Sequence, residues 1–263
     1  MGELVNLILL GIIEGVTEFL PISSTGHLLI AEHWLGRRSD VFNVVIQAGA
    51  ILAVVLIYRQ RLWELATGLA EPKNRDYALK LAVAFLITAS LGFVATKLGF
   101  KLPETITPVA WALILGGVWM IGAEQLAARQ PERTEITWRV AILVGLAQVV
   151  AGVFPGTSRS GATIFIAMLA GTGNRAAATE FAFLVGIPTM FAASGYELMK
   201  AMKAGAGHED WAGLAIAFVV SLVTAFVAVK WLLGYIRTHR FTAFAVYRIA
   251  LGIALLALLP AGL

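Results

Sequence analysis

Six segments of this chain are too long and too evenly apolar to be covered by a polar protein surface. A helix rises about 1.5 Å per residue and needs about 20 apolar residues to cross the hydrocarbon layer of a bilayer. Hydrophobic residues make up 59% of the chain and charged residues 14%, which leaves no material for a separate soluble domain. We therefore predict one all-α polytopic membrane domain over residues 1–263, with spanning helices over 41–58, 78–98, 107–122, 181–199, 211–236 and 243–259.

The charge pattern and the cysteine count exclude several other classes of protein. The net charge is +4, but the basic residues lie at the ends of apolar segments, so we predict no nucleic-acid partner. The chain has no cysteine, which excludes disulfides, thiolate metal sites and cysteine nucleophiles. Glu3, with no basic region before the first apolar run, argues against a cleaved signal peptide. Lysines at the span ends, together with Arg248, are expected to be snorkelling anchors.

Two stretches of similar design interrupt the apolar pattern at matching places. Residues 11–27 read GIIEGVTEFLPISSTGH, and residues 145–161 read GLAQVVAGVFPGTSRSG. Each is an apolar segment that breaks at a proline and continues through a turn rich in glycine and hydroxyl groups. Broken helices at corresponding positions of two halves are the best indication in a sequence of a binding site at the membrane midplane.

We predict two repeats of one unit, residues 1–136 and 137–263, each a re-entrant helical hairpin followed by three spanning helices. The first hairpin is expected over 4–20, with a turn over 21–26 and a return over 27–35; the second over 138–154, 155–161 and 162–170. Each returning arm has about nine residues, too few to cross the bilayer. Because three spans are an odd number, the second unit is predicted to be inverted, so that the two hairpin tips meet near the midplane.

The distribution of Lys and Arg orients this predicted topology. If the loop over 59–76 is cytoplasmic, that side collects twelve basic residues, and the other side collects six, including Lys101. A twofold excess on one side agrees with the positive-inside rule. The first hairpin is then expected to enter from the outside and the second from the cytoplasm.

Glu14 and Glu18 place two carboxylates on one helix face, since they are four residues apart. Two such groups repel each other in a low dielectric unless they share a proton or a cation holds them together. Ionisable groups inside an apolar segment are expensive and usually functional; a helix-capping or headgroup role is the alternative. Gln47 and Gln148 are polar groups inside spans and weaker candidates for contact with the site.

The first turn is expected to open a half-helix that binds an anion. Unsatisfied N–H groups and the helix dipole favour a negative ligand at such a terminus. Its residues are Ser23, Ser24, Thr25 and Gly26, and plain N-capping by the hydroxyls is the alternative. His27 follows directly, and beside a carboxylate pair we favour an acid–base or nucleophilic role over that of a packing histidine.

Arg159 is the most informative residue of the second turn. A guanidinium does not lose its proton, so at midplane depth it needs an anionic partner. That partner is either a glutamate of the first unit, in a structural salt bridge, or a phosphate, bound bidentately. Carboxylates, a divalent cation and substrate phosphate oxygens are the usual Mg²⁺ site of phosphoryl transfer. The turn offers further phosphate ligands in Thr157, Ser158, Ser160 and Gly161.

These motifs resemble those of the bacterial undecaprenyl-pyrophosphate phosphatase family, which is linked to bacitracin resistance. The similarity is carried by EGVTEFLPISSTGH at 14–27 and FPGTSRSG at 154–161, and also by FNVVIQAG at 42–49 and EFAFL at 180–184. It implies a membrane enzyme that removes the terminal phosphate of the isoprenyl pyrophosphate lipid and releases undecaprenyl phosphate for peptidoglycan synthesis. It also implies a divalent cation (Mg²⁺ or Ca²⁺), a place in the bacterial inner membrane and an active site open to the periplasm.

Carried over residue by residue, the resemblance implies five catalytic residues: Glu14, Glu18, Ser24, His27 and Arg159. Glu14 and Glu18 are expected to hold the metal, while Arg159 and the backbone amides of both turns bind the pyrophosphate. Ser24 or His27 attacks the terminal phosphorus, or His27 activates a water or Ser24; the sequence does not choose among these.

One position departs from the family's pattern. Asn43 stands where the family has an acidic residue. The departure implies either weaker binding of metal or substrate by this chain, or a peripheral position for this residue.

A secondary transporter or lipid flippase with inverted repeats is the alternative function. Broken helices and paired midplane carboxylates also suit proton- or ion-coupled transport. Such a carrier needs a titrating carboxylate but has no use for Arg159 and His27 beside hydroxyl-rich turns. We therefore favour the phosphatase, with the isoprenyl pyrophosphate lipid and the bilayer as partners. The sequence leaves the assembly state open, a homodimer included.

Overall fold

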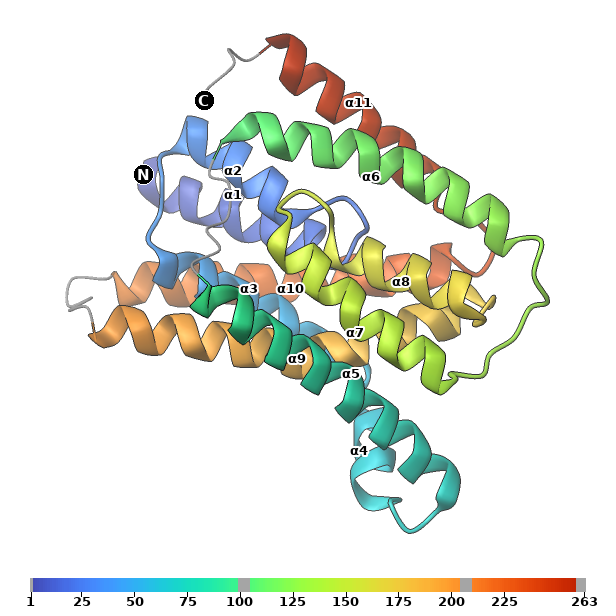
Figure 1. Ribbon diagram of the computed structural model, residues 1–263. Coiled ribbons are helices and arrows are strands. Elements are labelled where there is room, and N and C mark those ends of the chain that lie inside the picture. Colours follow the sequence, from blue (N-terminus) through green and yellow to red (C-terminus); the bar gives the residue numbers. More distant parts are fainter. Residues whose placement is uncertain (1, 99–104, 204–209, 259–263) are drawn as a thin grey trace.

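The computed structural model describes residues 2–98, 105–203 and 210–258, and this part of the chain folds into eleven helices without strands (Figure 1). The helices are α1 Gly2–Thr17, α2 Ser24–Leu35, α3 Asp40–Ile57, α4 Arg59–Thr67, α5 Pro72–Lys97, α6 Ile106–Ala127, α7 Trp138–Val153, α8 Arg159–Ala170, α9 Arg175–Lys203, α10 Trp211–Tyr235 and α11 Thr242–Leu258. The predicted all-α fold is confirmed.

Five of these helices, α3, α5, α6, α9 and α10, are long and apolar enough to cross a membrane. Each corresponds to one of the six predicted spans. The sixth, α11, has 17 residues in the described part of the chain, one fewer than α3, the shortest of the five. Leu259 at its predicted end lies outside the described residues, as does Lys101. The chain is a multi-pass membrane protein.

The predicted loop over 59–76 contains a helix that the sequence analysis did not anticipate. This helix, α4, and the start of α5 project away from the bundle (Figure 1). Pro72 occupies the first turn of α5, where a missing N–H group costs no helical hydrogen bond.

Both predicted hairpins are present, but their turns are shorter than the sequence suggested. The returning arms were expected from 27 and 162, whereas α2 already begins at Ser24 and α8 at Arg159. Serine caps account for the difference, because the side chains of Ser23 and Ser158 accept the N–H of the residue three positions later. At 12 residues, or about 18 Å, neither arm is long enough to cross a bilayer.

The first arm of each hairpin packs against a spanning helix at backbone distance. α1 contacts α10, and α7 contacts α5. A Cβ atom at Gly11 would lie 2.8 Å from the carbonyl oxygen of Ala217, and one at Gly145 would lie 2.7 Å from that of Ala84. Small residues allow helix backbones in membranes to approach this closely, so both hairpins are fixed to the spanning helices.

Arg248 is not a snorkelling anchor. Its side chain is fully buried in the middle of α11, which packs along α6 (Figure 1). A snorkelling side chain carries its charge to the interface, whereas this guanidinium donates to carbonyls of both hairpin turns, at Pro21 and Gly156. This charge therefore lies in the interior of the protein and not at the membrane surface.

Candidate active site

Two serines with unusual backbone geometry precede the helices that meet at the site. Ser23 caps α2 with a φ of 73°, and Ser158 caps α8 with a φ of 67°. The left-handed region costs a non-glycine residue about 1–2 kcal/mol, and such strain persists only where the surrounding structure enforces it. The serine oxygens accept the N–H groups of Gly26 and Gly161 at 3.4 and 3.2 Å, which leaves the earlier amides of each helix for a ligand.

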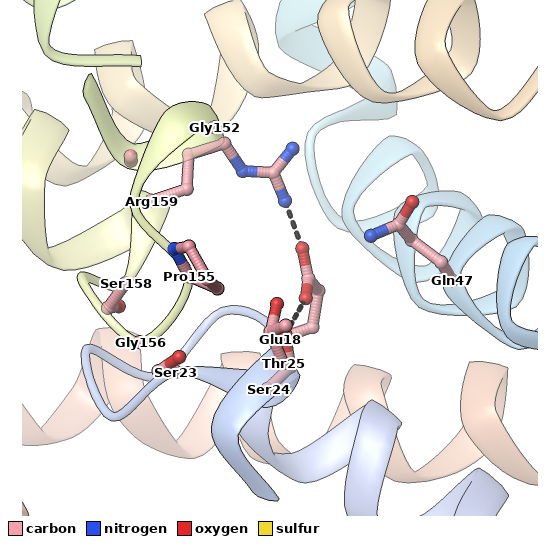
Figure 2. Close-up of a pocket in the computed structure, with 11 residues that line it drawn as sticks. Glu18, Ser23, Ser24, Thr25, Gln47, Gly152, Pro155, Gly156, Ser158 and Arg159 are labelled. Atoms are coloured by element: carbon pink, nitrogen blue, oxygen red, sulfur yellow. Dashed lines mark hydrogen bonds and ion pairs between the residues drawn. The ribbon is translucent and has the colours of Figure 1, made fainter. Parts of the chain in front are cut away.

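The two turns enclose a cavity of about 180 Å³ (Figure 2). Both halves of the chain supply its lining, which consists of Glu18, Ser23, Ser24, Thr25, Gln47, Ala151, Gly152, Pro155, Gly156, Ser158 and Arg159. A hydrogen bond of 2.9 Å from Ser160 Oγ to the Leu20 carbonyl joins the turns directly. The hairpin tips therefore meet, as the sequence predicts.

Glu18 connects the two turns within the cavity (Figure 2). Its buried carboxylate accepts a hydrogen bond from Ser24 Oγ on Oε2 and forms an ion pair with Arg159 on Oε1. Of the two partners considered for Arg159, the structure therefore contains the glutamate. The Arg159 side chain is 23% exposed, against 4% for Glu18, so an anionic ligand in the cavity can reach the guanidinium.

Glu14 lies one helical turn before Glu18 and is 2% exposed. The two carboxyl groups interact, and Oε2 of Glu14 finds no hydrogen-bond partner in the described part of the chain. An unpartnered buried oxygen is costly, which suits a position taken by a proton or a cation. Residues 2–98, 105–203 and 210–258 contain no metal-binding group of three His, Asp or Glu side chains. A cation here would have two protein carboxylates and take further ligands from phosphate or water.

His27 lies beside the cavity and is not one of the residues that line it. Its Nδ1 is 2.7 Å from the Ser23 carbonyl oxygen, and its Nε2 is 2.8 Å from the Tyr247 hydroxyl, with the two rings stacked. Both ring nitrogens are therefore engaged by neighbours. A role for His27 as acid, base or nucleophile stays a prediction.

The other predicted phosphate ligands fall into two groups. Thr25 lines the cavity, whereas Thr157 and Ser160 do not. The carbonyl of Thr157 and the hydroxyl of Ser160 are used to hold the turns in place. Gly26 and Gly161 donate their amides to the serine caps, so their contribution is to the shape of the turns.

Of the two candidate glutamines, Gln47 lines the cavity, whereas Gln148 in α7 does not. The Gln47 side chain lies across the cavity from the second turn (Figure 2). Its Oε1 accepts a hydrogen bond of 3.3 Å from Ser194. Gln148 donates to Thr88 at 3.2 Å and thereby joins α7 to α5. Asn43 does not line the cavity.

Comparison with known proteins identifies the family of the chain. The family model for bacitracin resistance protein BacA matches residues 7–254. The chain belongs to the BacA family. An undecaprenyl-diphosphatase of Rhizobium etli (strain CIAT 652) is 72% identical over 262 residues, which cover 99% of each chain. An undecaprenyl-diphosphatase of Xanthomonas axonopodis pv. citri (strain 306) is 67% identical over 262 residues, with the same coverage.

Two residues at the site of this BacA-family protein were missed as site residues by the sequence analysis, and both lie on α11. Tyr247 bonds to His27, and Arg248 bonds to both turns. For Arg248 an indication was present, because an ionisable residue in the middle of an apolar segment is seldom passive. Tyr247 carried no such indication, since a tyrosine within an apolar segment is ordinary.

Proposed function

We propose that this BacA-family protein is an undecaprenyl-diphosphate phosphatase, which hydrolyses undecaprenyl pyrophosphate to undecaprenyl phosphate and inorganic phosphate. This reaction recycles the lipid carrier for peptidoglycan synthesis. One observation carries the proposal: Ser24 of the first turn and Arg159 of the second contact the same carboxylate, Glu18, at the wall of a cavity. The high identity to curated undecaprenyl-diphosphatases over the whole chain supports it.

In the proposed reaction, the terminal phosphate enters the cavity and replaces Glu18 as the partner of Arg159. A guanidinium binds two phosphate oxygens in a planar fork, and the free amides at the starts of α2 and α8 add fixed positive dipoles. Both interactions strengthen as charge accumulates on the phosphoryl oxygens in the transition state. Binding of the substrate thereby releases the Glu18 carboxylate.

Ser24 is the nucleophile that the geometry favours, because its hydroxyl already donates to Glu18 and lines the cavity. Glu18 accepts the hydroxyl proton while Ser24 Oγ attacks the terminal phosphorus, and the anhydride P–O bond breaks to release undecaprenyl phosphate. A water then attacks the phosphoserine, the serine oxygen leaves and recovers its proton from Glu18, and inorganic phosphate departs. His27, which bonds to the Ser23 carbonyl, would hold the turn that carries this serine.

The proposal includes a divalent cation, Mg²⁺ or Ca²⁺. Glu14 and Glu18 would hold it, and the unpartnered Oε2 of Glu14 fits such a ligand. When bound, the cation supplies charge neutralisation to the pyrophosphate.

The proposed architecture has two inverted repeats, residues 1–136 and 137–263, each a re-entrant hairpin and three spanning helices. Corresponding contacts support it: α1 packs on α10 as α7 packs on α5, and α10 contacts α3 as α5 contacts α9. Gly11 and Gly145 occupy equivalent positions in these contacts, and Ser23 and Ser158 cap equivalent helices. Three spans per repeat invert the second repeat relative to the first.

The distribution of basic residues supports the proposed location. With the loop that contains α4 in the cytoplasm, the predicted excess of Lys and Arg lies on the cytoplasmic side. We place the protein in the bacterial inner membrane with its site open to the periplasm. A homodimer stays a prediction.

Phosphate release from a long-chain prenyl pyrophosphate tests the function. The detergent-purified protein is expected to release phosphate in a reaction that EDTA stops and that Mg²⁺ or Ca²⁺ restores, because the carboxylate pair needs a cation to accept a pyrophosphate. No release by folded protein across several cations would favour the transport function. Proton-coupled uptake into proteoliposomes would then be the next assay.

Gly152→Leu is expected to lower phosphate release about 100-fold, because displacing a bound substrate by about 1 Å is that costly. Gly152 lines the cavity, and a Cβ atom there meets nothing within 4 Å, so the leucine would occupy space that the phosphate needs. Leucine also favours the helix by about 1 kcal/mol over glycine, so the folded protein should not lose stability.

Gly122→Leu in α6 is the matched control for this variant. Its Cβ is equally unobstructed, but Gly122 does not line the cavity. Wild-type activity in Gly122→Leu and a large loss in Gly152→Leu would place the substrate in the cavity. Equal activity in the two variants would mean that the substrate binds elsewhere.

A further inference from the structure

The buried guanidinium of Arg248 links three parts of the protein. Its Nη2 donates to the carbonyl oxygens of Gly156 at 2.8 Å and Ala112 at 3.2 Å. Its Nη1 donates to those of Thr157 at 3.0 Å and Pro21 at 3.3 Å. Pro21 belongs to the first hairpin turn, Gly156 and Thr157 belong to the second, and Ala112 lies in α6. A single side chain from α11 thus holds both turns against the spanning helices.

This charge has no carboxylate partner among residues 2–98, 105–203 and 210–258. A fully buried cation without a counterion is expensive, and carbonyl dipoles compensate it only in part. A lysine could not make the same contacts, because its donors radiate from one nitrogen whereas the guanidinium presents a planar fork. The number and direction of the bonds therefore matter at this position, as well as the charge.

The two carbonyls that Arg248 binds in the second turn lie within its strained part. Gly156 has a φ of 92° and Ser158 a φ of 67°, and the carbonyls of Gly156 and Thr157 lie between these two positive φ angles. In a trans peptide the N–H points away from the carbonyl of the same unit. Arg248, by holding the Thr157 carbonyl, therefore directs the Ser158 N–H to the opposite side and opposes rotation of this peptide unit.

We propose that Arg248 is a positioning residue of the phosphatase site, an inference that rests on the proposed function. Its fork fixes both turns so that Ser24 and Arg159, the first residues of α2 and α8, reach the same carboxylate of Glu18. Arg248 does not touch the substrate in this role. It maintains a backbone conformation that is strained by itself and that persists only under such constraint.

Two kinds of substitution test the role. Arg248→Met removes the donors, and Arg248→Lys keeps the charge without the fork. Gly116→Ala leaves Arg248 intact, but its new Cβ would collide with Nη2 and displace the guanidinium. Arg175→Met is the control, since Arg175 pairs with a buried carboxylate, Glu124, whose other hydrogen bonds go to Phe241 and Thr242 and to neither turn.

The measurements are kcat and KM per folded molecule, and hydrogen–deuterium exchange of the segments 20–26 and 154–161. We expect Arg248→Met to lower kcat about 100-fold, the loss typical of a displacement of catalytic groups by about 1 Å, and to speed exchange in both segments. Arg248→Lys should recover less than about a tenth of the activity that Arg248→Met loses. Gly116→Ala should, like Arg248→Met, lower kcat and speed exchange. Arg175→Met should leave both unchanged.

Three results would overturn the inference. One is wild-type kcat in Arg248→Met. Another is a loss of total activity in Arg248→Met that equals the loss of folded protein, with hydrogen–deuterium exchange of the turns unchanged. The third is full recovery by Arg248→Lys, which would show that charge alone matters. If the wild-type protein releases no phosphate, the proposed function fails instead, and the exchange data still decide whether Arg248 holds the turns.

Discussion

Replacing Arg159 by alanine is expected to lower kcat/KM for phosphate release about 1,000-fold, the contribution typical of an arginine in phosphoryl transfer. The guanidinium is the proposed phosphate ligand of the second turn, where it lines the cavity and is positioned by its ion pair with Glu18. Arg159→Lys keeps the charge but loses the bidentate geometry, so its activity should lie between those of wild type and Arg159→Ala. The measurement is steady-state phosphate release from a prenyl pyrophosphate.

The folding cost of this substitution has to be separated from its effect on the reaction. Removing one partner of a buried ion pair costs about 3–5 kcal/mol of stability. The chain offers a matched control in Arg175, which also begins a helix and pairs with a buried carboxylate, Glu124; exposures are 27% and 3%, against 23% and 4% for the pair at the site. Arg175→Ala should lose stability and keep its activity per folded molecule. The role assigned to Arg159 is wrong if both alanine variants lose activity equally.

Glu18→Gln should reduce kcat about 1,000-fold, because the amide cannot take the proton of the nucleophile. Glutamine is of similar size and can still accept a hydrogen bond from Ser24, but it removes the charge that pairs with Arg159, so kcat is measured per folded molecule. Ser24→Ala should cause a similar loss. Because a base and its nucleophile act as a unit, the double variant Glu18→Gln, Ser24→Ala should be no worse than either single variant.

The double variant also tests whether Ser24 is the nucleophile. Losses that multiply would mean that Ser24 and Glu18 contribute independently, and the serine mechanism would then be wrong. His27→Ala provides the other arm of the test. Its ring bonds to Ser23 and Tyr247 and does not line the cavity, so we expect a smaller loss than for Ser24→Ala. If the substrate still phosphorylates the His27→Ala protein but not the Ser24→Ala protein, the phosphate acceptor is Ser24 Oγ.

Much of the fold was predictable because the bilayer restricts a chain to few solutions. Apolar runs of sufficient length gave five of the spans directly, and proline followed by hydroxyl and glycine residues located both turns. The helix starts were misplaced by three residues, because capping by Ser23 and Ser158 depends on φ angles that L-residues rarely adopt. Nothing in the residue types announces such a conformation.

The chemistry of the site was predictable only in part. Glu18, Ser24 and Arg159 stand in recognisable motifs, and they do meet at one cavity. The position of His27 beside Tyr247 could not be predicted, because it depends on how α11 lies relative to the first hairpin. Arg248 was assigned to the wrong environment for a similar reason: its acceptors are backbone carbonyls, which every residue possesses and which no sequence pattern distinguishes.

Both halves of the chain supply residues to the site, and this affects when the site can form during synthesis. Glu18 and Ser24 are synthesised early, whereas Arg159 and then Arg248 emerge from the ribosome only after more than half of the polypeptide. A nascent chain therefore has the carboxylate and the hydroxyl of the site but not the arginine proposed to bind the phosphate. Hydrolysis becomes available only when the last helices have entered the bilayer and closed on the first hairpin. The appearance of phosphatase activity during translation would thus report completed membrane integration.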